Sequence, residues 1–169
     1  MAEIRTLYRG KFLELVAHGH WEFVVRPNGA MPVGIVAVID NRLILISQYR
    51  IPVAKTCIEL PAGLAGDHGS ESWKTAALRE LREETGYAAD DMEYLTKGPP
   101  SAGLTSEVIT LARAIGLRKE GAPQPDGDEQ IQVHEIPLPD VPAFLKQKES
   151  EGCLVDPKIY TGLYFLTCK

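Results

Sequence analysis

The sequence predicts an α/β protein with a small β-sheet ahead of its main domain. Two observations carry this prediction: short β-branched apolar runs bounded by turn residues recur along the chain, and one long segment, 71–87, has the composition of a helix. A length of 169 residues fits one domain with a substantial core. We therefore expect an N-terminal β-strand segment over residues 1–30 and one larger domain over residues 31–169.

The N-terminal segment has the pattern of three short strands, over 4–8, 12–16 and 21–25, which are too small to bury a core alone. Trp21 has two interpretations, a stacking partner for a nucleobase or a core or subunit contact. His18 and His20 flank Gly19. Their alternate spacing could indicate a metal site, but a polar turn at the glycine is sufficient to explain them.

Central strands are expected over 33–39 and 43–47, because both runs are apolar and β-branched and the turn at 40–42 joins them as a hairpin. The second strand leads through Arg50 to a further strand around Cys57. That strand runs into residues 59–63, which end in Gly63.

The helix predicted in segment 71–87 ends at about Thr85. Ser70 or Ser72 is the candidate N-cap, alanines and leucines fill the following turns, and Gly86 supplies the left-handed residue that ends many helices. The local signals therefore define both ends of this helix.

Three glutamates of this helix, Glu80, Glu83 and Glu84, are expected to converge on one face, because residues three and four apart are neighbours. Like charges at this spacing repel one another, and we expect Arg79 and Arg82 to project to other sides. A hard divalent cation with oxygen ligands is the natural complement. A Glu/Arg-rich helix can also be a solvated surface face, but the upstream strand and glycine-bearing loop, 59–69, favour the metal site.

The same stretch resembles the longer part of a Nudix box, in which a Glu is followed, after seven residues, by Arg-Glu-apolar-any-Glu-Glu-any-Gly-apolar. The matching residues are Glu71, Arg79, Glu80, Leu81, Glu83, Glu84, Gly86 and Tyr87. The family's opening Gly would fall at Ala65, whereas the chain has Gly63, two residues farther from the first Glu. We interpret this difference as a lengthened loop.

This resemblance implies a Nudix-type α/β/α sandwich with a mixed sheet. The run around Arg50 and Glu59 is similar to the branch that hydrolyses ADP-ribose and nucleoside diphosphate sugars. In that branch the matching arginine contacts the diphosphate, the matching glutamate lies near the substrate, and the residue matching Ala62 offers its carbonyl oxygen to a metal ion. A surface salt bridge is the alternative role for Arg50. The branch also pairs its subunits through an N-terminal sheet, so we expect a homodimer.

A loop over 97–107 is expected between strands at 92–96 and 108–115. It resembles the loop in which ADP-ribose hydrolases carry a Ser-Glu pair, matched here by Ser106 and Glu107. The resemblance implies that Glu107 activates water or binds metal, and an exposed loop carboxylate is the alternative. Ala102 stands where the family has a proline that marks ADP-ribose specificity.

The C-terminal part is expected to contain a mobile loop over 119–130, rich in Pro, Gly and acidic residues, that could fold over a substrate. A strand over 131–136, a helix from Pro139 to Lys148 with Asp140 as its cap, and a closing helix over 156–166 follow.

Composition excludes several partners. The net charge of −5 and the lack of a long Lys/Arg run argue against nucleic acid, and no apolar run approaches the length of a membrane span. Three cysteines, Cys57, Cys153 and Cys168, share no metal-type spacing and follow no secretory leader, so we expect a cytoplasmic protein.

The carboxylate cluster predicts Mg²⁺-dependent hydrolysis of a diphosphate bond, with Mn²⁺ as a possible substitute, and the resemblance implies that the substrate is a nucleoside diphosphate sugar or ADP-ribose. The predicted metal ligands are the Ala62 carbonyl, Glu80, Glu83 and Glu84. Glu107 or Glu83 would take the proton from water, and Arg79 would orient the carboxylates. Two alternatives stay open: a Nudix hydrolase of a dinucleoside polyphosphate or an oxidised nucleotide, and a Nudix domain that senses a nucleotide without cleaving it.

Overall fold

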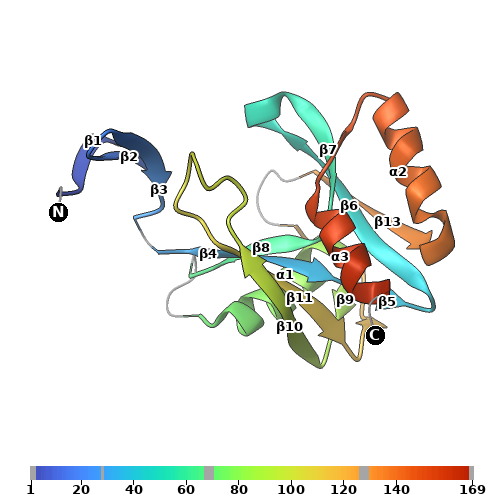
Figure 1. Ribbon diagram of the computed structural model, residues 1–169. Helices are drawn as coiled ribbons and strands as arrows, with labels where there is room; N and C mark the ends of the chain where they lie inside the picture. Colours follow the sequence, from blue (N-terminus) through green and yellow to red (C-terminus); the bar gives the residue numbers. More distant parts are fainter. Residues whose placement is uncertain (1–2, 28, 67–70, 126–129, 168–169) are drawn as a thin grey trace.

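A computed structural model describes residues 3–27, 29–66, 71–125 and 130–167 of the protein (Figure 1). Its elements in chain order are β1 (Arg5–Arg9), β2 (Glu14–His18), β3 (Trp21–Val25), β4 (Met31–Val36), β5 (Val38–Ile39), β6 (Arg42–Arg50), the 3-10 turn η1 (Ile51–Val53), β7 (Lys55–Glu59), β8 (Ala62–Ala65), α1 (Trp73–Thr85), β9 (Tyr87–Ala88), β10 (Asp91–Gly98), β11 (Ile109–Ile115), β12 (Arg118–Lys119), β13 (Ile131–Pro137), η2 (Leu138–Asp140), α2 (Val141–Ser150), β14 (Leu154–Val155) and α3 (Lys158–Thr167).

Two mixed sheets form the main domain. One has the strand order β10-β11-β4-β8, and the other has the order β13-β6-β7-β14 with β5 beside β6. In these two sheets, neighbouring strands are antiparallel except in the pairs β11–β4 and β7–β14. Helix α1 packs on one side of these sheets, and α2 and α3 pack on the other (Figure 1). The predicted α/β/α sandwich with a mixed sheet is confirmed.

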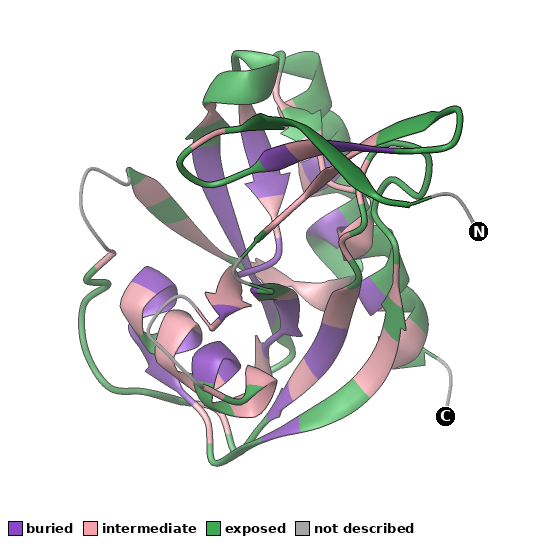
Figure 2. Ribbon diagram, turned by 90° about the vertical axis from the view of Figure 1, so that its left-hand side faces the viewer, coloured by how far each residue is buried: buried purple, intermediate pink, exposed green. Residues whose placement is uncertain are grey.

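Strand β4 contributes to both layers of the core because its side chains alternate between two faces. Val33 and Ile35 are fully buried in the cluster that includes Leu81 of α1. Val36 lies in the second cluster, which includes Ile159 of α3. Buried residues accordingly concentrate in the central strands (Figure 2). The position of α1 is thus fixed by apolar burial on the sheet.

Both predicted ends of α1 are confirmed. The Ser72 hydroxyl accepts a hydrogen bond from the Thr75 backbone N–H at 3.1 Å, and Gly86 ends the helix with φ 73°. A Cβ at Gly86 would lie 2.3 Å from the Gly121 carbonyl oxygen, so glycine is needed here for space as well as for conformation. Ser70, the other candidate cap, lies outside the described residues.

The predicted hairpin is confirmed at the turn but needs correction in the strand before it. Asp40 and Asn41 both adopt left-handed conformations, with φ 47° and 58°, as a tight two-residue hairpin requires. The expected strand over 33–39 is divided into β4 and β5, and Ala37 lies between them. The Ala37 carbonyl nevertheless accepts a hydrogen bond from the Ile44 N–H at 2.9 Å.

The two C-terminal helices start slightly later than expected. Helix α2 begins at Val141 after the turn η2, and Asp140 occupies its N-cap position without a side-chain capping hydrogen bond. Helix α3 begins at Lys158, whose backbone N–H donates to the Asp156 carboxylate at 2.8 Å. Asp156 therefore acts as the cap that the sequence pattern had placed inside the helix.

The N-terminal strands form a separate antiparallel sheet, β1-β2-β3, that projects away from the main domain (Figure 1). The small N-terminal sheet predicted from the sequence is therefore confirmed, whereas a domain boundary at residue 30 stays a prediction. Cys57 and Cys153 are free thiols, and Cys168 lies outside the described residues. Within the described ranges, no helix is both long enough and apolar enough to cross a membrane.

The environment of His134 predicts that the stability of the protein depends on pH. It lies between strand and helix layers, with Nε2 2.9 Å from the Ser47 hydroxyl oxygen and its ring 5.3 Å from that of Phe144. Burial, helped by the Lys148 charge, lowers the pKa of His134 below 6.5. The unfolded chain therefore binds a proton at a pH where the folded protein does not, so the free energy of unfolding should fall as the pH drops below about 6.5.

Urea denaturation of the wild type and of His134→Gln at pH 7.5 and pH 5.5 measures this effect. The variant, which can still hydrogen-bond to Ser47, should lose less stability between the two pH values than the wild type. Equal losses would show that His134 does not contribute to the pH dependence.

Candidate active site

The guanidinium of Arg79 lies among three carboxylates. It approaches the carboxylate oxygens of Glu83 at 2.7 Å, Glu80 at 3.1 Å and Glu71 at 3.3 Å. Burial opposes the charge of Arg79, but the hydrogen bonds to Glu71 and Glu83 raise its pKa overall. The prediction that Arg79 projects away from the acidic face is wrong, because the desolvated carboxylates attract it.

Glu84 anchors the buried side of α1 to the turn between β7 and β8. Glu84 is only 5% exposed, and its carboxylate accepts a hydrogen bond from the Ala62 backbone N–H at 3.0 Å. Such a charge-assisted hydrogen bond is stronger than a neutral one. It joins two residues predicted to bind metal, Glu84 of α1 and Ala62 of β8.

Glu80 faces Gly63 of β8 at a distance that excludes any side chain there. A Cβ at Gly63 would lie 1.9 Å from Glu80 Cγ and 2.4 Å from Oε1. Although Gly63 is two residues early relative to the family pattern, it therefore still provides the close approach. Gly63 and Glu71 are joined by the segment between β8 and α1, of which residues 67–70 lie outside the described part, so the lengthened loop stays a prediction.

The charge balance of this cluster fits a hard divalent cation. Burial raises the pKa of Glu80, Arg79 lowers it, and the neighbouring charge of Glu83 raises it further. One guanidinium cannot neutralise the three carboxylates that it contacts. Carboxylate and carbonyl oxygens are the ligands that Mg²⁺ prefers.

The carboxylates of Glu80, Glu83 and Glu84 were expected to converge on one face of the helix, but they do not form a complete set of metal ligands. Among the described residues, no group of three or more His, Cys, Asp or Glu side chains is arranged to hold an ion. The reason is visible in the contacts: Arg79 holds Glu80 and Glu83, while Glu84 is turned to the Ala62 N–H. A metal ion could gather these oxygens only after side-chain rotation.

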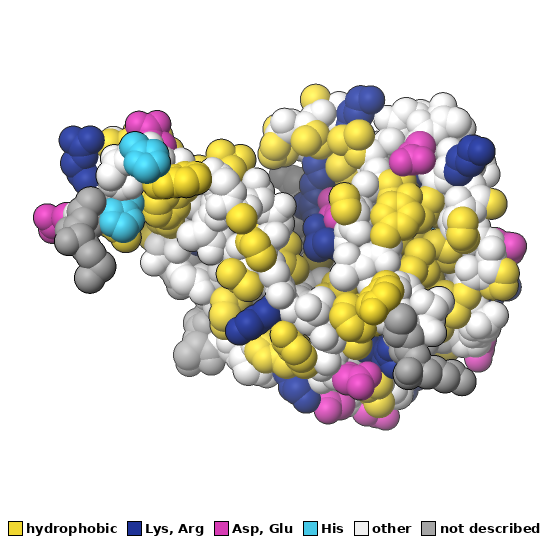
Figure 3. All heavy atoms as spheres, viewed as in Figure 1, with side chains coloured by type: hydrophobic (Ala, Val, Ile, Leu, Met, Phe, Trp, Pro, Cys, Tyr) yellow, Lys and Arg dark blue, Asp and Glu magenta, His cyan; other side chains and the backbone are white. Residues whose placement is uncertain are grey.

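Arg50 and Glu59 form a bidentate pair next to this turn. Both residues lie on the antiparallel strands β6 and β7, and the Arg50 Nε lies 3.0 and 3.1 Å from the two Glu59 oxygens. Arg50 is opposite Lys55 in the strand register, four positions along β6 from Ile46, the residue opposite Glu59, so its long side chain reaches back along the strand to Glu59, which is three residues before Ala62. The space-filling view shows basic and acidic side chains in a hollow beside β6 and β7 (Figure 3).

Glu107 lies in a different part of the site. Its carboxylate forms an ion pair with Arg26, and both residues line a cavity of about 480 Å³. Trp73, the first residue of α1, also lines this cavity, which connects Glu107 to the start of the carboxylate helix. Trp21 is 54% exposed on the N-terminal sheet, and no contact joins it to the carboxylates within the described chain.

The loop expected over 119–130 begins against the C-terminal end of α1. The Gln124 N–H donates to the Glu83 carbonyl at 2.7 Å, and the Glu120 N–H donates to the Gly86 carbonyl at 2.9 Å. This loop is thus anchored beside Glu83, and residues 126–129 lie outside the described part.

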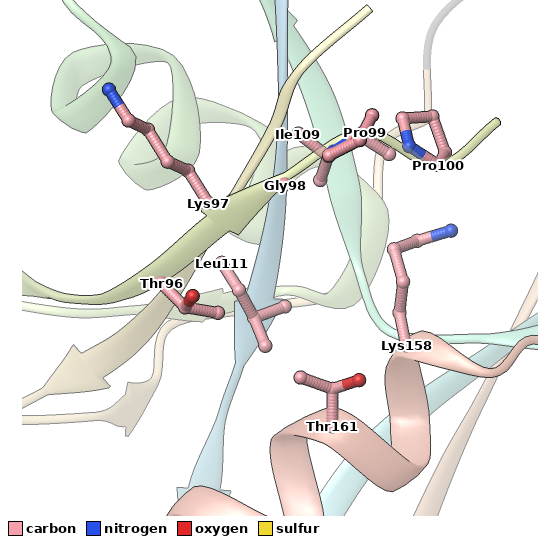
Figure 4. A pocket seen from close by; sticks show the side chains of 9 residues that line it. All are labelled: Thr96, Lys97, Gly98, Pro99, Pro100, Ile109, Leu111, Lys158 and Thr161. Atoms are coloured by element: carbon pink, nitrogen blue, oxygen red, sulfur yellow. The ribbon is translucent and has the colours of Figure 1, made fainter. Parts of the chain in front are cut away.

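A second cavity, of about 270 Å³, lies between β10, β11 and α3 (Figure 4). None of the predicted site residues lines it, and its Lys158 forms an ion pair with Asp156. In Figure 4 the Lys97 side chain points away from Thr161. We therefore place the candidate active site at α1, the β7–β8 turn and Arg50.

Sequence reasoning missed Arg26. A single arginine after an apolar strand carries no local signal, and its partner Glu107 is 81 positions away along the chain. The close approach of Gly63 to Glu80 was also not predictable from spacing, because the lengthened loop obscures it.

Comparisons with known proteins agree with this geometry. The sequence model of the NUDIX domain matches residues 30–155. The chain is 38% identical over 144 residues to the methanol dehydrogenase activator of Bacillus methanolicus, covering 85% of this chain and 74% of that protein. It is 31% identical over 176 residues to the ADP-ribose pyrophosphatase of Bacillus subtilis, covering 96% and 89%. A crystal structure of an ADP compounds hydrolase superposes with a TM-score of 0.69 at 25% identity, covering 83% of this chain and 80% of that one.

The close contact between Gly63 and Glu80 predicts that a side chain at position 63 weakens metal binding. In Gly63→Ala the new methyl group would displace the Glu80 carboxylate, so we expect the affinity for Mn²⁺ to fall about 10- to 100-fold. Titration followed by electron paramagnetic resonance of free Mn²⁺ measures this. Gly98→Ala is the matched control, because nothing lies within 4 Å of a Cβ at Gly98. Equal Mn²⁺ binding by both variants would remove Glu80 from the metal site.

Proposed function

Because the chain belongs to the Nudix family of pyrophosphohydrolases, we propose that it hydrolyses the diphosphate bond of ADP-ribose or another nucleoside diphosphate sugar. The products would be a nucleoside monophosphate and a sugar phosphate. The observation that carries the proposal is the cluster of desolvated carboxylates on α1, in which Glu84 is hydrogen-bonded to Ala62, three residues after Glu59, the partner of Arg50.

The choice of substrate rests on two supports. An ADP-ribose pyrophosphatase and an ADP compounds hydrolase are among the proteins that the chain resembles over most of its length. In addition, Arg50 has the planar, permanently charged donor group that suits a diphosphate. Ala102, in place of the proline of ADP-ribose hydrolases, makes other nucleoside diphosphate sugars candidates alongside ADP-ribose.

The metal ligands would be Glu80, Glu83, Glu84 and the Ala62 carbonyl. A bound Mg²⁺ or Mn²⁺ ion neutralises phosphoryl charge and makes a water molecule more acidic. Arg79 would release Glu83 and Glu80 to the ion while keeping Glu71, which holds the guanidinium beside the site.

The remaining steps belong to side chains of the protein. Arg50 would bind the diphosphate, and Glu59 would keep the guanidinium oriented toward it. Glu107, or alternatively Glu83, would accept the proton of the attacking water. Trp21 would stack on the base if the N-terminal sheet of a partner subunit brings it to the site.

Two alternative functions remain testable. A Nudix hydrolase of a dinucleoside polyphosphate or an oxidised nucleotide would use the same carboxylates. A non-catalytic sensor would be expected to have lost at least one of them, whereas Glu80, Glu83 and Glu84 are all present. We therefore favour hydrolysis.

A homodimer is part of the proposal. The N-terminal sheet exposes several large apolar side chains, among them Ile4, Tyr8, Phe12 and Trp21. The space-filling view shows hydrophobic side chains on the N-terminal sheet, which projects from the main domain (Figures 1 and 3). A second copy of the same sheet would cover them symmetrically.

The proposed activity predicts the behaviour of Glu84→Gln. The amide can still accept the Ala62 N–H, but it binds a divalent cation poorly, so Mg²⁺-dependent turnover should fall at least about 100-fold. The assay follows release of monophosphate from ADP-ribose, ADP-glucose, UDP-glucose and a diadenosine polyphosphate.

Glu93→Gln, at an exposed position on β10, should keep wild-type turnover. Full activity of Glu84→Gln would contradict the proposal that the carboxylates of α1 bind the catalytic metal ion. Binding of a nucleotide without release of monophosphate by the wild type would identify a sensor.

The proposed dimer predicts that the double variant Tyr8→Ser, Phe12→Ser shifts the protein toward the monomer. Light scattering during gel filtration measures the mass at several concentrations. Tyr160→Ser, which removes an exposed aromatic ring from α3, should leave the dimer intact. A monomeric wild type would contradict this part of the proposal.

A further inference from the structure

The loop that carries Glu107 is bound to the N-terminal sheet through one isolated parallel bridge to β3. The Val24 N–H of β3 donates to the Leu104 carbonyl at 2.9 Å, and the Ser106 N–H donates to the Val24 carbonyl at 3.1 Å. Val24 and Thr105 form the corresponding parallel bridge. The N-terminal sheet therefore fixes the backbone immediately before Glu107.

The Glu107 side chain is fixed by the same sheet. Arg26, the residue after β3, forms an ion pair through its Nε with Glu107 Oε1. Their side chains are 30% and 21% exposed, so the pair is shielded from water more than most surface pairs. Arg9 and Glu14 form another ion pair in this sheet, but Arg9 is 72% exposed and does not contact the loop.

The local turn completes the support. The Glu107 N–H donates to the Thr105 hydroxyl at 3.0 Å, and the Leu104 N–H donates to the Ser101 carbonyl at 3.0 Å. These bonds shape the loop itself, whereas the contacts to Val24 and Arg26 tie it to the N-terminal sheet.

We propose that Arg26 is a positioning residue for Glu107, and that the N-terminal sheet thereby sets the catalytic geometry of the main domain. The catalytic consequence rests on the proposed function, in which Glu107 accepts the proton of water. A general base must lie within hydrogen-bond reach of that water, and misplacement by about 1 Å can cost 100-fold in rate. Arg26 would keep the carboxylate on the cavity that Trp73 of α1 also lines.

The role of Arg26 differs from that of a structural ion pair in two ways that can be measured. Loss of Arg26 should lower kcat about 10- to 100-fold with little change in KM, because the substrate still binds while the base is misplaced. It should also free the backbone of residues 104–107, which hydrogen exchange followed by mass spectrometry detects without any assay of activity.

The experiment compares Arg26→Ala, Arg26→Lys, Glu107→Gln and the double variant Arg26→Ala, Glu107→Gln. Arg26→Ala should lose kcat and exchange faster at 104–107, and Arg26→Lys should lie between it and the wild type because the charge is kept without the planar fork. The double variant should be no slower than Glu107→Gln, since the two residues act as one unit. Added guanidinium ion should partly restore Arg26→Ala but not the double variant.

Arg9→Ala is the matched control, because it removes an ion pair of the same sheet that does not touch the loop. It should leave kcat and the exchange at 104–107 unchanged. Wild-type exchange and kcat in Arg26→Ala would overturn the positioning role, and so would additive losses in the double variant. If the wild type cleaves none of the substrates while Arg26→Ala still loosens 104–107, the proposed function fails and the structural coupling stands.

Discussion

The structure depends on burying a row of glutamates at the interface between α1 and the β7–β8 turn. Glu80 and Glu84 lie where water is largely excluded, and burial raises the pKa of Glu80, whose carboxylate pairs with Arg79. The single positive charge of Arg79 cannot balance the three carboxylates that it contacts, so the cluster keeps a net negative charge. This excess is costly in a folded protein unless a further cation binds there.

The rest of the fold serves to hold that row in place. The apolar face of α1, with Ala77 and Leu81, packs on the central strands, so its acidic face is directed at the turn. Gly86 ends the helix where the loop before residue 125 docks, and Gly63 gives Glu80 room to approach the backbone. On the β6–β7 hairpin, the Arg50 guanidinium pairs with Glu59, the last residue of β7 before the same turn.

Local signals in the sequence were sufficient for much of this arrangement. The cap at Ser72, the stop at Gly86 and the hairpin at Asp40 and Asn41 each depend on residues within one turn, and all three are confirmed. The direction of Arg79 was predicted wrongly, although its contact with Glu83 has the i,i+4 spacing of helix neighbours. Its contact with Glu71, which lies before α1, depends on how the chain enters the helix. Two-residue strands such as β9 and β14 were missed because they carry no periodic pattern. The pair of Arg26 and Glu107 joins segments that only the tertiary fold brings together.

The central claim is that the carboxylates of α1 bind a divalent cation, to which Arg79 releases Glu83 and Glu80. Crystals of the wild type grown with Mn²⁺ and a non-hydrolysable ADP-ribose analogue, measured at the manganese absorption edge, test it most directly. We expect anomalous density bounded by Glu80, Glu84 and the Ala62 carbonyl, with Glu83 turned away from Arg79. Ordered analogue with no anomalous density along α1, and with Arg79 still bound to Glu80 and Glu83, would contradict the account.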